Sequence, residues 1–506
     1  MGIRDTILER DGRHFPGKSY AEAVLVPIFE QAKRHLLAPM LAIHRAHLVM
    51  LVERGIVPAG QGRRILAALA SIDPAEVARS QYDGRFEDLF FYIEELLIQR
   101  AGEVAGNLHI ARSRNDMGVA MYRMVLRQQL LDVLDGMVAL HQTLVRLAEE
   151  HVDTLCLAYT HTQPAQPTTL AHYLLAAADV LARDIERLQQ AYGRVNRSPL
   201  GAAALTTSGF PVDRSRVAEL LGFDGLVENS YDAIASVDYL TEAASALQLA
   251  FVHTGRMVQD LLVWCTQEFG ALRLADAYVQ CSSIMPQKRN PVGLEHARAL
   301  LSSGAASAAA VVAVIHNTPF GDIVDSEDDL QPHLWRAAEV GARVFPLLAN
   351  VVGTVEVNRE LLERRARASF ATVTELADAL VRHHGLDFRT AHRVVARAVA
   401  RATAAGRTAA EISAADVAAA GAEVLGAPLP VAEETVRQAL DPGVFVRVRR
   451  VTGGPAPEEV RRMLAARGQV QASLRAWLEE RRAALKRAEA RLDQACRELA
   501  GDGAGA

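Results

Sequence analysis

The sequence predicts an all-α protein built around a long helical bundle, and three observations support this class. Ala, Leu, Arg and Glu are abundant while aromatic residues make up 5% of the 506 residues, and this balance favours helices because such side chains lose little rotamer freedom there. Apolar residues recur at steps of three and four in four long segments without proline, 117–152, 168–197, 232–269 and 292–317. Helices of that length reach roughly 40–55 Å and bury their apolar stripes only by packing together.

The regions on either side of the bundle are predicted to form two smaller helical domains. Residues 1–111 hold shorter helices, because prolines and glycines interrupt them at Pro58, Gly60, Gly62 and Pro74. The central bundle domain is then 112–367, and residues 368–506 form an Ala- and Arg-rich C-terminal helical domain. A chain of this length accommodates three domains of ordinary size.

The C-terminal domain is expected to end in an extended helix over 457–499. Leucines recur every seven residues along it, at Leu478, Leu485, Leu492 and Leu499, which is the spacing of a coiled-coil seam. The seam could pack on its own domain or on a partner chain, and the spacing leaves both open. The glycine-rich tail, 501–506, is expected to be disordered.

Charge and cysteine content exclude several classes of partner. The net charge of −5 offers no basic excess for a phosphate backbone, so nucleic acid is not expected to bind. The four cysteines, Cys156, Cys265, Cys281 and Cys496, are far apart and fit no metal-ligand spacing, and scattered free thiols suit a reducing cytoplasm. The N-terminus is too charged for a secretory signal, and no apolar run is judged to approach the ~20 residues of a membrane span.

Three polar, helix-breaking segments interrupt the apolar pattern at or near the starts of long helices. They are Arg112–Asp116 (RSRND), Tyr159–Thr168 (YTHTQPAQPT) and Cys281–Pro291 (CSSIMPQKRNP). Free N–H groups and a partial positive charge at a helix start favour carboxylates. Taken singly, each has an ordinary interpretation: a capped turn with Asp116 as the N-cap, a loop histidine at His161, and capping serines at Ser282 and Ser283. Their joint occurrence in this order favours a dicarboxylate site.

The segment SSIMPQKRNP resembles the signature loop of the fumarase/aspartase superfamily, and the Gln before Lys288 is typical of its argininosuccinate lyase branch. RSRND, THTQPAQPTTLAHYLLA and FATVTELADALVRHHGLDFRTAH, which ends at His392, also resemble that branch. The resemblance covers about residues 20–450. It implies a three-domain fumarase/aspartase-type fold whose central helices form a twenty-helix core in a homotetramer. Each active site would then take the three segments from three different subunits, with no metal and no cofactor.

The resemblance also implies roles for individual residues. Ser282 matches the serine that removes the β-proton of the aspartate moiety, and Lys288 and Asn290 match the groups that meet the negative charge developing on its carboxylate. Preorganised positive charge would stabilise both the serine alkoxide and that carboxylate. His161 matches a histidine near the leaving nitrogen, and Glu295 matches the carboxylate that pairs with it. The other residues matched to substrate binding are Ser113, Arg114, Asn115, Thr160, Gln163, Ser283 and Met285.

The half of the site that would hold arginine departs from the family pattern. In DIVDSEDDL, residues 322–330, Asp322 stands where the family has Tyr, Glu327 where it has Gln, and Leu330 where it has Lys. Val237 replaces an Arg, and Lys33 replaces an acid. A buried mismatch of charge costs several kcal/mol unless it is compensated. The residues matched to the succinyl half of the substrate are kept, so we expect the altered positions to select a different amine half.

These observations predict a carbon–nitrogen lyase that releases fumarate and an amine from an N-substituted aspartate. An ethylenediamine-disuccinate-like aminocarboxylate, or a substrate of specialised metabolism, would fit the altered amine end. Three alternatives remain open: an authentic argininosuccinate lyase with compensating neighbours, a superfamily relative with another reaction such as a cycloisomerase or a deaminase, and a non-catalytic structural homologue of the crystallin type.

Overall fold

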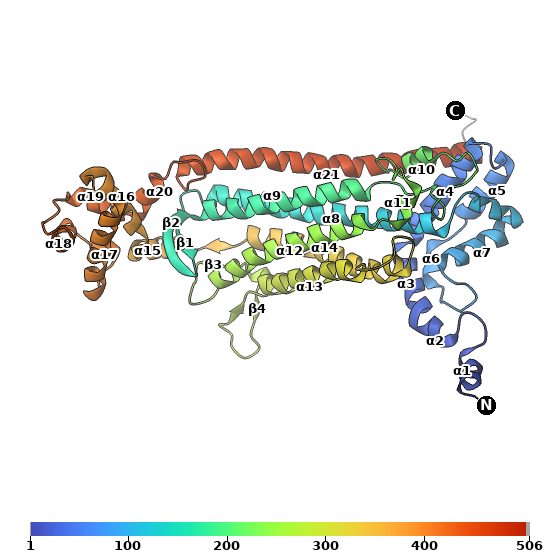
Figure 1. The fold of residues 1–506 in the computed structure, drawn as a ribbon, viewed down its shortest axis with the longest axis horizontal. Coiled ribbons are helices and arrows are strands. Elements are labelled where there is room, and N and C mark those ends of the chain that lie inside the picture. Colours follow the sequence, from blue (N-terminus) through green and yellow to red (C-terminus); the bar gives the residue numbers. More distant parts are fainter. Residues whose placement is uncertain (1, 502–506) are drawn as a thin grey trace.

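A bundle of long helices forms the middle of the chain, in a computed structural model that describes residues 2–501 (Figure 1). Its helices are α8 (Arg114–Glu150), α9 (Leu170–Val195), α12 (Asp238–Trp264), α13 (Val292–Val314) and α14 (Gln331–Gly353). Strands in the described part of the chain are short, so the all-α prediction is confirmed. The expectation for the tail at 502–506 lies outside the described residues.

Helix α14 was not among the four predicted bundle helices, because it contains Pro346. A proline inside a helix removes one backbone hydrogen bond and its ring needs space. The opposing helix supplies that space at Gly136, where an added Cβ would lie only 2.6 Å from the Pro346 ring carbon Cδ. Helix α14 packs along α8 and α13 and buries Val344, Phe345 and Leu348 completely.

The long terminal helix α21 (Pro457–Ala500) runs back along the outside of the bundle (Figure 1). It packs on α8 and α9, and its last turns reach helices of the N-terminal region. Leu478 joins the central core and Leu492 joins the N-terminal core. The heptad leucines therefore pack within the chain, on the bundle and the N-terminal helices.

The N-terminal region is a cluster of shorter helices at the end of the bundle where α8 begins (Figure 1). They are α1 (Ile3–Asp11), α2 (Lys18–Tyr20), α3 (Val26–His35), α4 (Leu37–Glu53), α5 (Ala59–Ala70), α6 (Pro74–Arg79) and α7 (Leu89–Ala101). Their core also takes in Met117 and Tyr122 from the first turns of α8. Two short helices, α10 (Arg214–Leu220) and α11 (Ser230–Ala235), lie in the connection from α9 to α12.

A separate group of helices lies at the opposite end of the molecule (Figure 1). It consists of α16 (Val373–His384), α17 (Phe388–Ala404), α18 (Ala414–Leu425), α19 (Glu433–Leu440) and α20 (Pro442–Arg447). This group has its own apolar core, and α15 (Arg359–Ala368) connects it to the bundle. Three main cores thus accompany the three proposed regions, although α21 leaves the C-terminal region to cover the other two.

Short antiparallel strand pairs occur at the bundle's turns. The sequence placed a polar loop at 159–168, whereas the structure has a β-hairpin of β1 (Leu155–Thr160) and β2 (Gln163–Thr169). The two-residue connection, His161 and Thr162, has positive φ at both positions, as tight hairpin turns require. The other pairs are β3 (Leu272–Arg273) with β6 (Glu356–Val357), and β4 (Gln280–Cys281) with β5 (Arg289–Asn290).

Helix α13 corrects the expectation that no apolar segment reaches the length of a membrane span. By length and composition it could cross a bilayer, and a bent pair formed by 18–35 and 37–53 passes the same test. Only 28% of the apolar window of α13 is buried within the chain. Most residues of this window are therefore exposed or only partly buried in a single copy of the chain.

Candidate active site

The turn that opens α8 is held by a reciprocal cap. Ser113 is the N-cap residue, and its Oγ accepts from the backbone N–H of Asn115 at 3.3 Å. Asp116 occupies the third helical position, and its Oδ1 accepts from the backbone N–H of Ser113 at 3.1 Å. The expectation that Asp116 is the N-cap was wrong, because the helix begins three residues earlier and Asp116 completes the capping box.

The carboxylate of Asp116 also fixes the loop that follows α9. Its Oδ2 accepts from the backbone N–H groups of Gly201 at 2.9 Å and Ala203 at 3.1 Å. The side chain is fully buried, and burial raises the pKa of Asp116 to about 6 against the opposing effect of these N–H donors. Below the turn, Arg112 is buried and donates to Nδ1 of His44 at 3.0 Å. The turn is therefore rigid before any ligand arrives.

Arg114 points to acids of the N-terminal region. Its guanidinium lies 2.7 Å from Asp88 and 3.1 Å from Glu87, and 4.8 Å from the ring of Phe91. Side-chain hydrogen bonds to Asp88 and Glu87 raise the pKa of Arg114 although partial burial opposes them. These carboxylates neutralise part of the positive charge that Arg114 would offer to a substrate anion.

Two of the altered family positions meet beside this turn. Asn115 donates through Nδ2 to Asp322, and Asp322 is hydrogen-bonded in turn to Glu327. Burial, followed by the charges of Asp322 and Asp328, raises the pKa of Glu327 to about 8. Burial also raises the pKa of Asp322. Glu327 therefore holds its proton near neutral pH more readily than an exposed glutamate does, and the pair carries less than its full negative charge.

Lys33, another of the altered positions, contacts residues of its own N-terminal region. Its ammonium contacts Glu30 at 2.8 Å and the carbonyl oxygen of Ser80 at 2.5 Å, and it lies 5.4 Å from the centre of the Phe29 ring. The side chain is only 7% exposed. Lys33 thus has local partners, and its proposed contact with substrate would require some of them to be exchanged.

The hairpin tip presents its polar residues to solvent. Thr160, His161 and Gln163 are all exposed, and Thr160 pairs with Gln163 across the two-residue turn. Positive φ angles of 50° at His161 and 62° at Thr162 place two non-glycine residues in a sparsely populated conformation. Such strain persists only where surrounding structure restrains the turn.

The loop between β4 and β5 carries the proposed base. Ser282 Oγ accepts from the backbone N–H groups of Ile284 at 3.3 Å and Met285 at 3.2 Å. Ser283 and Lys288 are exposed, and Asn290 pairs with Gln280 at the base of the loop. The N–H donors favour a negative charge on Ser282 Oγ, as a serine base needs.

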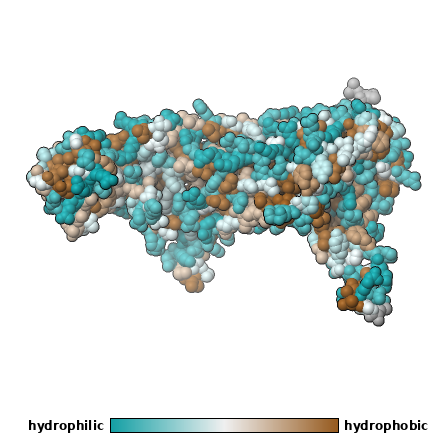
Figure 2. Space-filling model, viewed as in Figure 1, coloured by the Kyte–Doolittle hydropathy of each residue, from teal (hydrophilic) through white to brown (hydrophobic). Residues whose placement is uncertain are grey.

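The tip of this loop is apolar as well as exposed. Ile284 is 83% exposed and Met285 38% exposed, and the loop projects from the side of the bundle as a separate protrusion with an apolar end (Figure 2). Glu295 follows in the first turn of α13 and is also exposed. Large apolar side chains held away from the body are typical of a surface that another chain or a ligand covers.

The three polar segments do not meet within one copy of the chain. Helix α8 has 37 residues, so Ser113 at its start lies roughly 55 Å from the hairpin that follows its end. Helix α13 has 23 residues and separates Ser282 from Asp322 by roughly 35 Å. Among residues 2–501, no hydrogen bond or ion pair joins His161 to Glu295 or Ser282 to Lys288. One chain brings together Ser113, Asn115, Asp322 and Glu327, and it leaves the hairpin and the β4–β5 loop far from this group.

Sequence reasoning missed several neighbours of the Asp322–Glu327 pair. Tyr122 is buried beside it, and Glu327 and Asp328 are among the charges that raise the pKa of Tyr122 well above its usual range. Asp328 itself has a pKa raised to about 6, chiefly by burial. Tyr122 follows Asn115 by seven residues, or two helical turns, so helical spacing could have placed both on one face. The acids that face Arg114 are distant in sequence and gave no local signal.

Comparison with known proteins identifies the family. The chain is 44% identical over 460 residues to argininosuccinate lyase 2 of Agrobacterium fabrum, covering 90% of this chain and 91% of that protein. The chain belongs to the argininosuccinate lyase family. A family model described as lyase matches residues 84–303, and the argininosuccinate lyase C-terminal model matches residues 370–447. Argininosuccinate lyase of Methanoculleus marisnigri is 39% identical over 455 residues, with 90% and 91% covered.

Solved structures agree with membership of the argininosuccinate lyase family. EDDS lyase in complex with formate superimposes with a TM-score of 0.87 at 32% identity, and 97% of each chain is covered. A variant of EDDS lyase with bound fumarate gives the same score over 98% of each chain. Class II fumarase of Schistosoma mansoni shares the fold, with a TM-score of 0.66 at 15% identity. The protein is a carbon–nitrogen lyase of the fumarase/aspartase superfamily.

Proposed function

We propose that this lyase catalyses the reversible β-elimination of an amine from an N-substituted aspartate, releasing fumarate. The observation that carries the proposal is the capped turn at Ser113–Asn115, because the start of the 37-residue helix α8 favours a carboxylate at this place. Similarity to argininosuccinate lyases and to EDDS lyase, one variant of which binds fumarate, supports the same reaction. Small-molecule substrate and products are therefore the expected partners.

In this reaction Ser282 removes the proton from the carbon next to the distal carboxylate. Two backbone N–H groups already point at its Oγ, and Lys288 on the same loop adds positive charge when the loop closes. Loss of the proton places a second negative charge on the carboxylate, which Lys288 and Asn290 meet. Ser113, Arg114, Asn115 and Thr160 hold the succinyl part, and Ser283, Met285 and Gln163 line it.

The leaving nitrogen takes a proton as its bond to carbon breaks. His161 is the proposed donor, and Glu295 raises its basicity and fixes its tautomer. Closure of the β4–β5 loop would exclude water from the carbanion and place Ile284 and Met285 against the other walls of the site. No step in this sequence needs a metal or an organic cofactor.

The site is proposed to form between copies in a homotetramer. Its segments lie too far apart in one chain, and the central helices expose apolar side chains that a second copy would cover: Leu249, Val252 and Val263 on α12 and Val312 on α13. A groove of about 480 Å³ runs between these helices, lined by residues such as Gly255, Leu301 and Ala305. Small residues allow close approach of another helix.

The amine half of the substrate is proposed to carry a second cationic group. Asp322 and Glu327 place negative charge beside Asn115 even though burial raises the pKa of both carboxyls, and Asp328 adds to this charge. This charge attracts an ammonium group and repels a carboxylate at the same place. The similarity to EDDS lyase favours a diamine-derived aspartate, and the acid pair favours one whose distal nitrogen is free.

The reverse reaction tests this directly. Purified protein is mixed with fumarate and, separately, ethylenediamine, 1,4-diaminobutane, methylamine, arginine or aspartate, and loss of fumarate absorbance is followed. We expect diamines to react and arginine to be at least about a hundredfold slower, since each misplaced buried charge costs several kcal/mol. Fast consumption with arginine would instead establish an authentic argininosuccinate lyase. Failure with every amine would favour the non-catalytic homologue or a superfamily relative with another reaction.

A further inference from the structure

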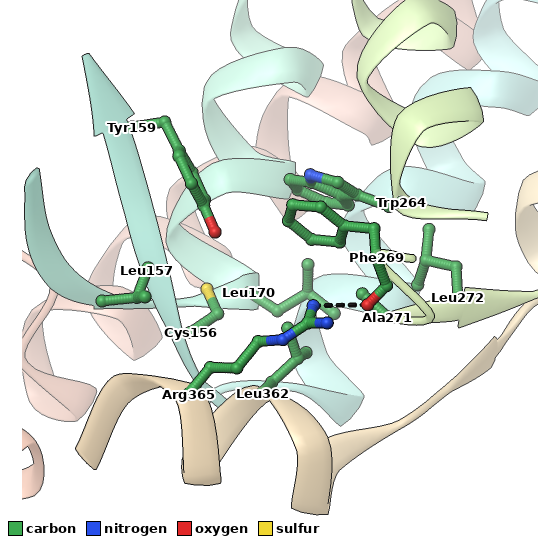
Figure 3. Close-up of a pocket in the computed structure, with 10 residues that line it drawn as sticks. All are labelled: Cys156, Leu157, Tyr159, Leu170, Trp264, Phe269, Ala271, Leu272, Leu362 and Arg365. Carbon is green, nitrogen blue, oxygen red and sulfur yellow. Dashed lines mark hydrogen bonds between the residues drawn. The ribbon is translucent and has the colours of Figure 1, made fainter. Parts of the chain in front are cut away.

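We propose that Arg365 and Phe269 are positioning residues for His161, acting through a floor of side chains beneath the hairpin. The inference rests on the proposed function, in which His161 donates a proton to the leaving nitrogen and must therefore be held in place. The floor itself comes from segments far apart in sequence: the end of α12, the turn after it, and α15 (Figure 3).

The hairpin strand β1 rests on a column of aromatic rings. The ring of Tyr159 lies 5.9 Å from that of Phe269, which lies 6.4 Å from Trp264. Trp264 in turn lies 4.8 Å from Tyr173 on α9. Tyr159 is two residues before His161. The packing of Tyr159 on these rings therefore restrains the position of the hairpin tip.

Arg365 contacts both the backbone and the ring of Phe269. Its guanidinium donates to the backbone carbonyl of Phe269 and, at 2.9 Å, to that of Glu268. The same group lies 5.0 Å from the centre of the Phe269 ring, a cation–π distance. One planar side chain thus fixes both the backbone of the turn and the ring that supports Tyr159, which a lysine could do only in part.

The space enclosed by this floor is apolar and nearly filled. Cys156, Leu157, Leu170 and Leu362 close it (Figure 3), and about 10 Å³ remains for the centre of a water-sized sphere, room for at most one water. Burial raises the pKa of Cys156 to about 12, so its thiol stays neutral and acts as packing. The cavity is too small for a ligand, and its walls serve to place the hairpin.

The strained turn explains why such placement is needed. His161 and Thr162 both adopt positive φ, a conformation that costs of order 1 kcal/mol or more per residue. The exposed tip makes few contacts of its own, so the restraint must come from the strands and from what lies beneath them. Removing the contacts of Arg365 or Phe269 should therefore let the turn relax and should increase the mobility of His161.

The test compares two of the arginines on α15, Arg365 and Arg359, in the full-length protein. Arg365→Met should make backbone amides at 159–163 exchange hydrogen about tenfold faster, with little change in α8 or α13. Arg359→Met is the matched control, because Arg359 donates to a backbone carbonyl of Glu150 from the same helix, away from the hairpin tip. Arg365→Lys should restore part of the protection. Where an amine substrate is found, kcat should fall about tenfold and KM should change less than about twofold.

Unchanged exchange at 159–163, or an increase spread over the whole molecule, would overturn the proposal. A kcat equal to that of the parent despite a loosened hairpin would also overturn it. If Arg365→Met does not fold, Phe269→Leu removes the ring but keeps the carbonyl acceptor, and the same exchange result is required of it. Hydrogen exchange is measured without substrate, so it tests the placement of the hairpin independently of activity. Absence of turnover by the parent protein would count against the proposed function alone.

Discussion

The two ends of the bundle differ in how complete they are within one chain. At the start of α8, Ser113, Asn115 and Asp116 are linked by hydrogen bonds, and the Asp322–Glu327 pair is hydrogen-bonded to them. At the hairpin and the β4–β5 loop, His161 and Lys288 are exposed. The first end has its proposed binding groups in place within one chain. At the second end, the proposed acid and the lysine need assembly or loop closure to reach the substrate.

This difference has a physical basis. Groups that recognise a fixed carboxylate gain from being rigid, because no reorganisation is then needed on binding. A base and an acid that must surround a reacting carbon have to let the substrate enter, so they gain from movable loops.

Ser282→Ala should reduce turnover by about a thousandfold or more, since it removes the proposed base. Folding and fumarate affinity should be largely kept, because the residues proposed to hold the succinyl part, Ser113, Asn115 and Thr160, lie on other segments. Steady-state kinetics with calorimetric titration of fumarate would check both. Ser283→Ala is the neighbouring control, and a larger loss there than at Ser282 would reassign the base.

Mixing two inactive variants should restore activity if the site is shared between copies. Ser282→Ala and His161→Gln, unfolded together and refolded, should regain about a quarter of parental activity, because random assembly gives that fraction of sites with both intact residues. Each variant refolded alone should remain inactive. An inactive mixture that nevertheless assembles with the size of the parental oligomer would argue that Ser282 and His161 work from one chain.

Glu327→Gln should change the dependence of stability on pH. The pKa of Glu327 is raised to about 8 in the folded chain from 4.5, so the folded state keeps a proton that the unfolded state releases. This contribution is full below about pH 4.5 and is lost as pH rises through 8. The parent should therefore lose thermal stability between pH 5 and pH 8 more steeply than the variant.

Thermal unfolding at both pH values would check this, with Glu149→Gln, at an exposed position near the far end of α8, as control. Asp116 and Asp328 titrate with the same sign, so a slope should persist in the variant and only its steepness should fall. Equal slopes in parent and variant would show that Glu327 does not carry the bound proton.

Sequence reasoning succeeded where a signal is local and failed where it depends on contacts. The long helices α8, α9, α12 and α13 follow from apolar spacing, and α14 was missed because Pro346 is tolerated only by virtue of Gly136 on another helix. The hairpin was taken for a loop, since its prolines Pro164 and Pro167 weaken any strand pattern. Asp116 was expected to be the N-cap of α8, whereas Ser113 holds that position and Asp116 completes the capping box.

Periodicity and short motifs occupy consecutive positions, so they were enough to predict the all-α class, the family and the residue types that carry the proposed chemistry. The fold was needed to show that Asn115 meets Asp322, that burial beside Asp322 raises the pKa of Glu327, and that α21 returns along the bundle. These facts depend on burial and on residues far apart in the chain. The separation of the three polar segments is of the same kind: long helices hold them apart, so their proposed meeting requires more than one copy.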